Sequence, residues 1–281
     1  WKNLKRNDFS KMGMINLAYP YNNSKIIRNA ALCVSFLIFL PIIIVFYLIR
    51  PFYPIKFVRI RDDRIGNLVM NTELFLRRVK LGIYKKNVLY IGIAGKNPCN
   101  KQLLEMFKRA MIIIQVPKPV EILFNILSNR RDLLKGIISY LTFVDYERAY
   151  YEFNNAGSSL QFNEKEEKKG KKLLKKMGVN NWFICFHARD SSYLKNTFKK
   201  MDSSHHNYRD CNIENYLKAA DYITKQGGYA IRIGSVVEKK MQHLKNKKII
   251  DYAANFRTDF GDIYLLAKCK FFLSSTSGLF Q

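Results

Sequence analysis

The 281-residue chain is poor in the residues that build metal sites and disulfide frameworks. It contains 4 histidines and 5 cysteines, and no two cysteines form a CxxC pair. Since neither residue type shows metal-ligand spacing, the sequence predicts no structural metal ion and no metal cofactor. Cys185 and Cys269 fall in apolar runs, which indicates buried, reduced thiols and a reducing compartment such as the cytosol.

Two sequence motifs that would point to common ligands are also missing. No GxxxxGK[ST] loop occurs, which argues against phosphoryl transfer of the P-loop type. No recognisable motif interleaves basic with aromatic residues, so the sequence gives no support for nucleic acid as a partner.

Acidic residues are scarce, with 22 against 48 basic residues and a net charge of +26. The excess is spread along the chain: residues 1–54 contain 7 basic and 1 acidic, residues 55–180 contain 25 and 12, and residues 181–281 contain 16 and 9. Such a broad excess suits an anionic membrane surface or phosphate-bearing ligands. For any single lysine, a solvated position is the simpler expectation.

A stretch without charge runs from residue 30 to residue 49, bounded by Arg28 and Arg50. Its length matches a hydrocarbon core of about 30 Å. We therefore predict a basic juxtamembrane segment over 1–28 and a single-pass transmembrane helix over 29–50. Pro41 should kink this helix, and a re-entrant hairpin is the alternative. Basic residues flank both ends, so we assign the large domain to the cytoplasmic face from its free cysteines and its predicted chemistry.

Strand and helix patterns alternate after this segment, which predicts α/β architecture with parallel sheets. The expected strands are 56–60, 87–94, 111–116, 182–187, 229–233 and 248–250. The expected helices follow Gly66 to about 79 and cover 101–110, 120–127, 131–141, 164–177 and 213–226. We predict an N-terminal lobe over 55–162, a bridging helix over 163–180 and a C-terminal lobe over 181–281. The chain stops just after a strand and a loop, so we expect this second lobe to be incomplete.

The last part of the chain, from Asp262 to Gly278, predicts a short helix, a buried strand and a loop of small hydroxyl residues. Ser275, Thr276 and Ser277 form the centre of that loop. At the carboxyl end of a strand in an open α/β sheet, such a loop lets an anion approach the backbone. An ordinary polar turn is the alternative.

Two further strand ends offer groups that suit a diphosphate. His187 and Arg189 end one strand, while Arg232 and Gly234 end the next. A guanidinium can donate two parallel hydrogen bonds to a phosphate, and the imidazole could donate a third. Because parallel strands share a direction, these groups should meet the hydroxyl loop at one edge of the sheet. Alternatively, Arg189 pairs with Asp190, and His187 is an interior histidine.

Several short motifs together resemble a family of bacterial glycosyltransferases associated with surface-polysaccharide biosynthesis, over roughly residues 56–281. They are Arg64-Ile-Gly-Asn-Leu68, Thr72-Glu-Leu-Phe-Leu76, Phe186-His-Ala-Arg-Asp190, His206-Asn-Tyr-Arg-Asp210, Ile213-Glu-Asn-Tyr-Leu217, Gly227-Gly-Tyr-Ala-Ile-Arg-Ile-Gly234 and the run from Asp262 to Gly278. The HxRD element and the terminal run also resemble the donor-binding motifs of fucosyltransferases that use GDP-fucose. The sequence departs from the family pattern at Asn67, where a histidine is usual.

This resemblance implies a GT-B fold with two Rossmann-like lobes and a nucleotide-sugar substrate, possibly GDP-linked, with no further cofactor. It implies that Arg189 holds the donor diphosphate. It also implies that Asp262 and the Ser275–Ser277 loop contact the nucleotide or its phosphates.

Metal-independent sugar transfer also needs a base for the acceptor hydroxyl. Glu73, on the first helix of the N-terminal lobe, is the candidate, with Asp63 behind it. A solvated helix residue is the alternative for Glu73.

The sequence thus predicts a membrane-anchored glycosyltransferase of hexosyl or fucosyl type. It would transfer a sugar from a nucleotide-diphosphate donor to a surface-glycan or lipid-linked acceptor, beside an anionic membrane surface. The alternative is a non-enzymatic, membrane-tethered basic scaffold that binds polyanions.

Overall fold

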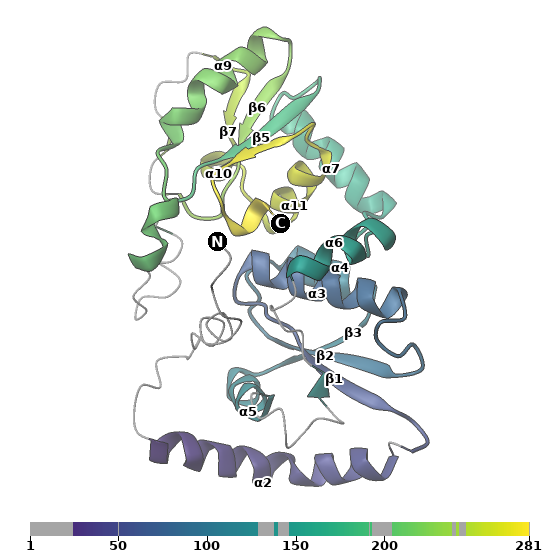
Figure 1. Cartoon of the computed structure of the whole chain (residues 1–281). Helices are drawn as coiled ribbons and strands as arrows, with labels where there is room; N and C mark the ends of the chain where they lie inside the picture. Colours follow the sequence, from purple (N-terminus) through teal and green to yellow (C-terminus); the bar gives the residue numbers. More distant parts are fainter. Residues whose placement is uncertain are drawn as a thin grey trace, which may run out of the picture. The chain divides into compact units, whose positions relative to one another are not determined.

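The computed structural model describes residues 25–49, 51–128, 138–139, 146–190, 192, 204–237, 240–241 and 246–280. The predicted basic segment over 1–28 therefore lies almost wholly outside the described residues. The described chain is a mixed α/β protein with two four-stranded sheets, in which every pair of neighbouring strands is parallel (Figure 1).

The chain divides into two compact units. Unit 1 comprises residues 1–63, 70–98 and 107–160, and unit 2 comprises 64–69, 99–106 and 161–281. The predicted bridging helix over 163–180 belongs to unit 2, and its bridging role stays a prediction.

Unit 1 contains the sheet β3-β2-β1-β4. Its strands are β1 (Ile55–Arg59), β2 (Leu89–Gly95), β3 (Ile112–Val116) and β4 (Ile138–Ser139). The helices between residues 25 and 155 are α2 (Lys25–Ile49), α3 (Ile65–Lys80), α4 (Lys101–Lys108), α5 (Lys118–Ser128) and α6 (Tyr146–Asn155). Of these, residues 65–69 of α3 and 101–106 of α4 belong to unit 2.

Unit 2 contains the sheet β7-β6-β5-β8. Its strands are β5 (Phe183–His187), β6 (Tyr229–Arg232), β7 (Ile249–Asp251) and β8 (Phe272–Ser274). Its helices are α7 (Glu164–Lys176), α9 (Leu217–Lys225), α10 (Tyr252–Asn255) and α11 (Asp259–Lys268), with 3₁₀ turns η1 (Ser204–Arg209), η2 (Ile213–Tyr216) and η3 (Gly278–Phe280).

Both sheets have the same strand order relative to the chain. Three successive strands are added outward in one direction, and the fourth then pairs with the first strand on its other side. This is the order of a Rossmann-like half-sheet, and the reversal creates a switch point between the first and fourth strands. The predicted α/β class with parallel sheets is therefore confirmed.

The sheet of unit 2 is covered by apolar side chains on both faces, as parallel sheets require. Alternate residues of β5 separate the two layers, with Phe183 and Cys185 in one cluster and Ile184 and Phe186 in the other. Leu265 of α11 packs in the first cluster and Ala220 of α9 in the second. Cys185 is buried, as predicted, whereas the prediction of a buried thiol is wrong for Cys269, which is half-buried.

Helix α7 begins and ends at signals that the sequence provides. Asn163 and Glu166 form a reciprocal capping box at its N-terminus. After the C-cap, Gly178 adopts φ +74°, a left-handed conformation that favours glycine. The helix predicted over 164–177 is thus observed almost residue for residue.

Residues 29–49 of the segment predicted to cross the membrane are helical and lie within α2, whereas residue 50 lies outside the described residues. Among the residues that the structure describes, however, no helix is both long and apolar enough to span a bilayer. The single-pass prediction is therefore not confirmed. The side chains of Phe36, Phe39 and Ile43 on α2 pack against Phe124 and Leu127 of α5.

Three further expectations need correction. The helix predicted over 131–141 is wrong at Ile138–Ser139, which form strand β4 beside β1; the neighbouring residues lie outside the described part of the chain. The helix predicted over 213–226 begins as the 3₁₀ turn η2 and becomes α-helical at Leu217. Strand β8 was expected to be buried and is only half-buried. Helix α6 was not predicted.

A glycine in α7 provides a test of the packing within unit 2. A Cβ atom at Gly170 would fall within the ring of Tyr264, whereas one at Gly157 would meet nothing within 4 Å. Gly170→Ala should therefore lower the free energy of unfolding by about 1–3 kcal/mol, because overpacking outweighs the gain in helix propensity. Urea unfolding of the full chain measures this, and Gly157→Ala is the matched control. An unchanged midpoint for Gly170→Ala would contradict the contact between α7 and α11.

Candidate functional site

The loops that follow β5 and β8 lie next to each other at the switch point of the unit 2 sheet. β8 pairs in parallel with β5, with His187 opposite Ser274. The carboxyl ends of both strands therefore meet at one edge. In open α/β sheets, ligands bind in the crevice at this position.

Hydrogen bonds connect the two loops directly. The backbone N–H of Arg189 donates to Ser275 Oγ at 2.9 Å. The backbone N–H of Ser275 donates to the carbonyl of His187 at 3.3 Å. The structure thus brings together the HxRD segment and the serine-threonine loop, as the sequence predicted.

The Arg189 side chain is held in an ion pair within unit 2. Its guanidinium donates to a carboxylate oxygen of Asp210, and the residue is only 8% exposed. Burial lowers the pKa of Arg189, while the neighbouring Asp210 opposes this shift. The alternative considered above was an ion pair between Arg189 and Asp190; the structure shows an ion pair at Arg189 with Asp210.

Asp210 is a residue to which sequence reasoning gave no role. It ends the His206–Asp210 motif, and the next backbone N–H, that of Cys211, donates to the Arg189 carbonyl at 2.9 Å. This contact sets the two segments side by side. The sequence showed the motif, but only the tertiary structure places its aspartate on the guanidinium.

His187 is half-buried, and its Nδ1 lies 2.9 Å from the Ile233 carbonyl oxygen. A carbonyl can only accept, so Nδ1 carries the proton in this contact. Burial lowers the pKa of His187 and favours the neutral ring. In that form Nε2 is an acceptor, so the predicted donation to a phosphate oxygen would require the ring to become protonated.

The two groups predicted to bind the donor at the end of β6, Arg232 and Gly234, make contacts within unit 2 itself. Arg232 is buried and donates to Asp251 at 3.2 Å. Gly234 has φ +157°, and a Cβ there would meet Val237 Cγ1 at 3.1 Å. Gly234 therefore provides backbone conformation and space, while the Arg232 side chain stabilises unit 2 internally.

Asp262 lies in the first turn of α11 and is 2% exposed. Arg257 Nε and Nη2 donate to its Oδ2 at 3.1 and 3.0 Å. Its Oδ1 is buried and has no hydrogen-bond partner among the described residues. Burial raises the pKa of Asp262 to about 7, although the Arg257 charge opposes the shift.

The remaining loop residues differ in exposure. Thr276 is exposed. The Oγ of Ser277 is buried and has no hydrogen-bond partner among the described residues. A buried hydroxyl without a partner costs stability.

Glu73, the predicted base, is not a solvated helix residue. It is 4% exposed, and its Oε1 accepts from Arg77 Nε and from the Ser159 backbone N–H, both at 2.8 Å. Its Oε2 is buried without a partner among the described residues. Glu73 therefore has one structural oxygen and one oxygen that could accept a proton.

A second buried carboxyl in unit 1 was missed. Asp62 follows β1 and accepts from the Gly95 N–H at 2.7 Å. Burial raises the pKa of Asp62, and the nearby Glu121 adds to the effect. From the sequence, the neighbouring Asp63 was the second candidate base, because the sequence of the Asp62-Asp63 pair does not show which side chain points inward.

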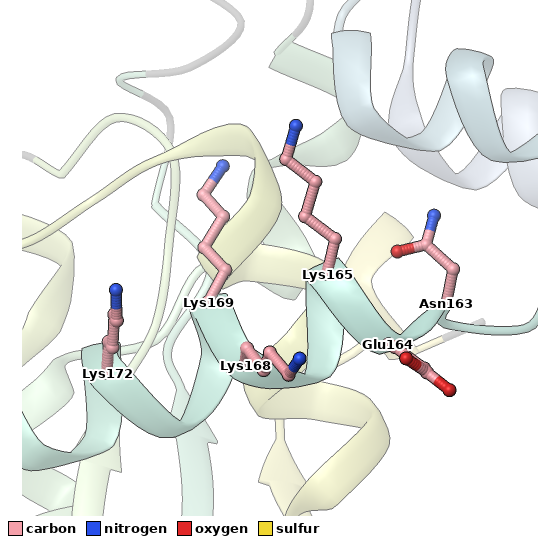
Figure 2. A pocket seen from close by; sticks show the side chains of 6 residues that line it. All are labelled: Asn163, Glu164, Lys165, Lys168, Lys169 and Lys172. Atoms are coloured by element: carbon pink, nitrogen blue, oxygen red, sulfur yellow. The ribbon is translucent and has the colours of Figure 1, made fainter.

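A hollow of about 780 Å³ lies elsewhere, along the start of α7. Figure 2 shows its lining, which comes entirely from Asn163 and α7 and includes four lysines. It contains none of the predicted donor residues. Lysines from one helix face make a basic surface, without the convergent groups of a catalytic site.

Among the described residues, no group of three His, Cys, Asp or Glu side chains is placed to hold a metal ion. Comparisons of the chain with known protein families, curated proteins and solved structures gave no match.

The buried Asp262 predicts a specific pH dependence of stability. Its folded-state pKa lies above the unfolded value, so its favourable contribution is complete below pH 4 and disappears as pH rises through about 7. Relative to Asp262→Asn, the wild type should lose about 2–3 kcal/mol of unfolding free energy between pH 5 and pH 8. Urea titrations of both proteins at several pH values measure this difference. Parallel pH profiles would contradict it.

Proposed function

We propose that the chain is a metal-independent glycosyltransferase of GT-B type that moves a sugar from a nucleotide-diphosphate donor to a surface-glycan or lipid-linked acceptor. One observation supports this most strongly: the Arg189 backbone N–H and the Ser275 hydroxyl meet at the switch point of a Rossmann-like sheet. The resemblance of the surrounding motifs to bacterial glycosyltransferases and GDP-fucose enzymes supports the donor class, possibly GDP-linked.

In this proposal, Arg189 and the hydroxyls of the Ser275–Ser277 loop bind the diphosphate. Charge-assisted hydrogen bonds would stabilise the leaving nucleoside diphosphate as negative charge develops on it. Asp210 holds the guanidinium in place before the donor arrives, and its negative charge opposes the anionic ligand. Asp262 contacts the nucleotide in the same proposal.

Glu73 is the proposed base, acting through Oε2, which accepts the proton of the acceptor hydroxyl. The Arg77 and Ser159 hydrogen bonds on Oε1 keep this carboxyl in one orientation. A positioned base of this type contributes about 10²–10⁴-fold to a rate.

In the same proposal, the enzyme acts at the cytoplasmic face of an anionic membrane. The proposed acceptor class and the basic composition support this location. The alternative, a basic scaffold that binds polyanions without catalysis, rests on the four lysines of α7. Binding by such a scaffold would fall steeply with salt for any polyanion.

The diphosphate contact can be tested by calorimetry with GDP and UDP on the full chain. Arg189→Ala should weaken binding about 10–100-fold, since it removes a charge-assisted hydrogen bond. Asp210→Asn should tighten binding, because it removes a negative charge near the ligand and keeps an acceptor for Arg189. Arg109→Ala, an exposed arginine of unit 1, is the control and should bind as the wild type does. Wild-type affinity in Arg189→Ala would exclude the contact.

The base can be tested with a matched pair of buried carboxylates. Glu73 pairs with Arg77, and Glu152 pairs with Arg78 in the same way from α6. Glu73→Gln should lower kcat about 10²–10⁴-fold with unchanged GDP affinity, whereas Glu152→Gln should affect stability alone. Release of nucleoside diphosphate, from the nucleotide sugar that most raises Tm, measures kcat. Equal kcat values in the two variants would remove Glu73 as the base.

A further inference from the structure

Helix α2 has one face that packs on unit 1. Its less exposed positions, at 35, 36, 39, 40, 43 and 46, lie along one side of the helix. Phe36, Phe39 and Ile43 contact the Phe124 and Leu127 cluster of α5. Phe46 meets Phe57 of β1 edge to face, with ring centroids 4.8 Å apart.

The opposite face of α2 is apolar and exposed over about four turns. Leu37 and Leu48 are 69% and 70% exposed. The other large exposed side chains of this outer face are Val34, Ile38, Ile42, Ile44, Val45 and Ile49. From residue 33 to residue 49 the outer face contains no charged side chain.

A continuous apolar surface of this kind marks an interaction site, because exposed leucine and isoleucine side chains leave apolar area in water that a partner would bury. Its surroundings indicate which partner covers it. Phe52 and Tyr53, directly after α2, are 79% and 71% exposed. Exposed aromatic side chains beside an apolar helix are typical of the boundary between lipid headgroups and acyl chains.

The charge of the chain around α2 also favours a lipid surface as the partner. No acidic residue occurs between Asp8 and Asp62, whereas Lys25, Arg28, Arg50, Lys56 and Arg59 all fall in that interval. Such a segment is complementary to anionic headgroups. A second copy of the chain would instead bring two basic segments together, which is unfavourable.

We propose that α2 lies in the plane of an anionic membrane surface, with its outer face in the lipid and its inner face on α5. The apolar outer face enters the boundary between headgroups and acyl chains, as interfacial helices do. This proposal shares the membrane location with the proposed function but requires neither nucleotide binding nor sugar transfer.

Co-sedimentation of the full chain with vesicles tests the surface. The chain should bind vesicles of phosphatidylcholine with phosphatidylglycerol more tightly than vesicles of phosphatidylcholine alone. The double variant Leu37→Glu/Leu48→Glu should bind the anionic vesicles at least about tenfold more weakly. The control, Ile83→Glu/Leu89→Glu, changes two exposed apolar residues elsewhere in unit 1 and should bind as the wild type does. Equal loss in both double variants would overturn the proposal.

A fluorophore attached to single cysteines placed from residue 34 to residue 48 then measures depth in the vesicle. Lipid exposure should repeat every 3.6 residues, with positions 37, 38, 45 and 48 in lipid and positions 39 and 43 shielded. One smooth maximum near the middle of the helix would show a spanning helix and overturn the in-plane arrangement. Vesicle-independent dimers that Leu37→Glu/Leu48→Glu dissociates would assign the face to a second copy. GDP affinity measured in parallel separates failure of this proposal from failure of the proposed function.

Discussion

The parallel pairing of β8 with β5 is the constraint on which the candidate site depends. Because β8 returns to the side of β5 opposite β6, the chain order reverses there, and two loops far apart in sequence share one sheet edge. The hydrogen bond from the Arg189 N–H to Ser275 Oγ joins them. If β8 paired elsewhere, the serine-threonine loop and the HxRD segment would not form one site.

Each unit contains buried arginine side chains that pair with carboxylates, but the surroundings of these pairs differ. In unit 1, Arg77 and Arg78 are adjacent on α3 and pair with Glu73 and Glu152, so both carboxylates are compensated in the interior. In unit 2, Arg189 is compensated by Asp210, whose side chain is 26% exposed. Breaking a buried pair leaves a charge without compensation, so each of these residues affects stability as well as any chemistry. This is why a matched carboxylate is needed to separate the two roles.

The local sequence was sufficient for most of the fold. Periodicity and capping residues predicted the strands of both sheets except β4, and they predicted helix α7, since these signals act over a few residues. They failed at Ile138–Ser139, which were expected in a helix over 131–141 and pair with β1 instead. They also failed to show that α2 has an inner and an outer face, because residues 30–49 carry no charge on any side of the helix and only packing against α5 distinguishes the two faces.

Sequence alone therefore determined the α/β class, the alternation of elements, and which residue types stand at the strand ends. The tertiary structure decided the partners: Asp210 for Arg189, Arg77 for Glu73, and Arg257 for Asp262. The physical reason is the separation along the chain over which each kind of interaction acts. Backbone conformation follows from neighbours within one or two turns, whereas an ion pair or a buried surface depends on which distant segments packing brings within a few ångströms.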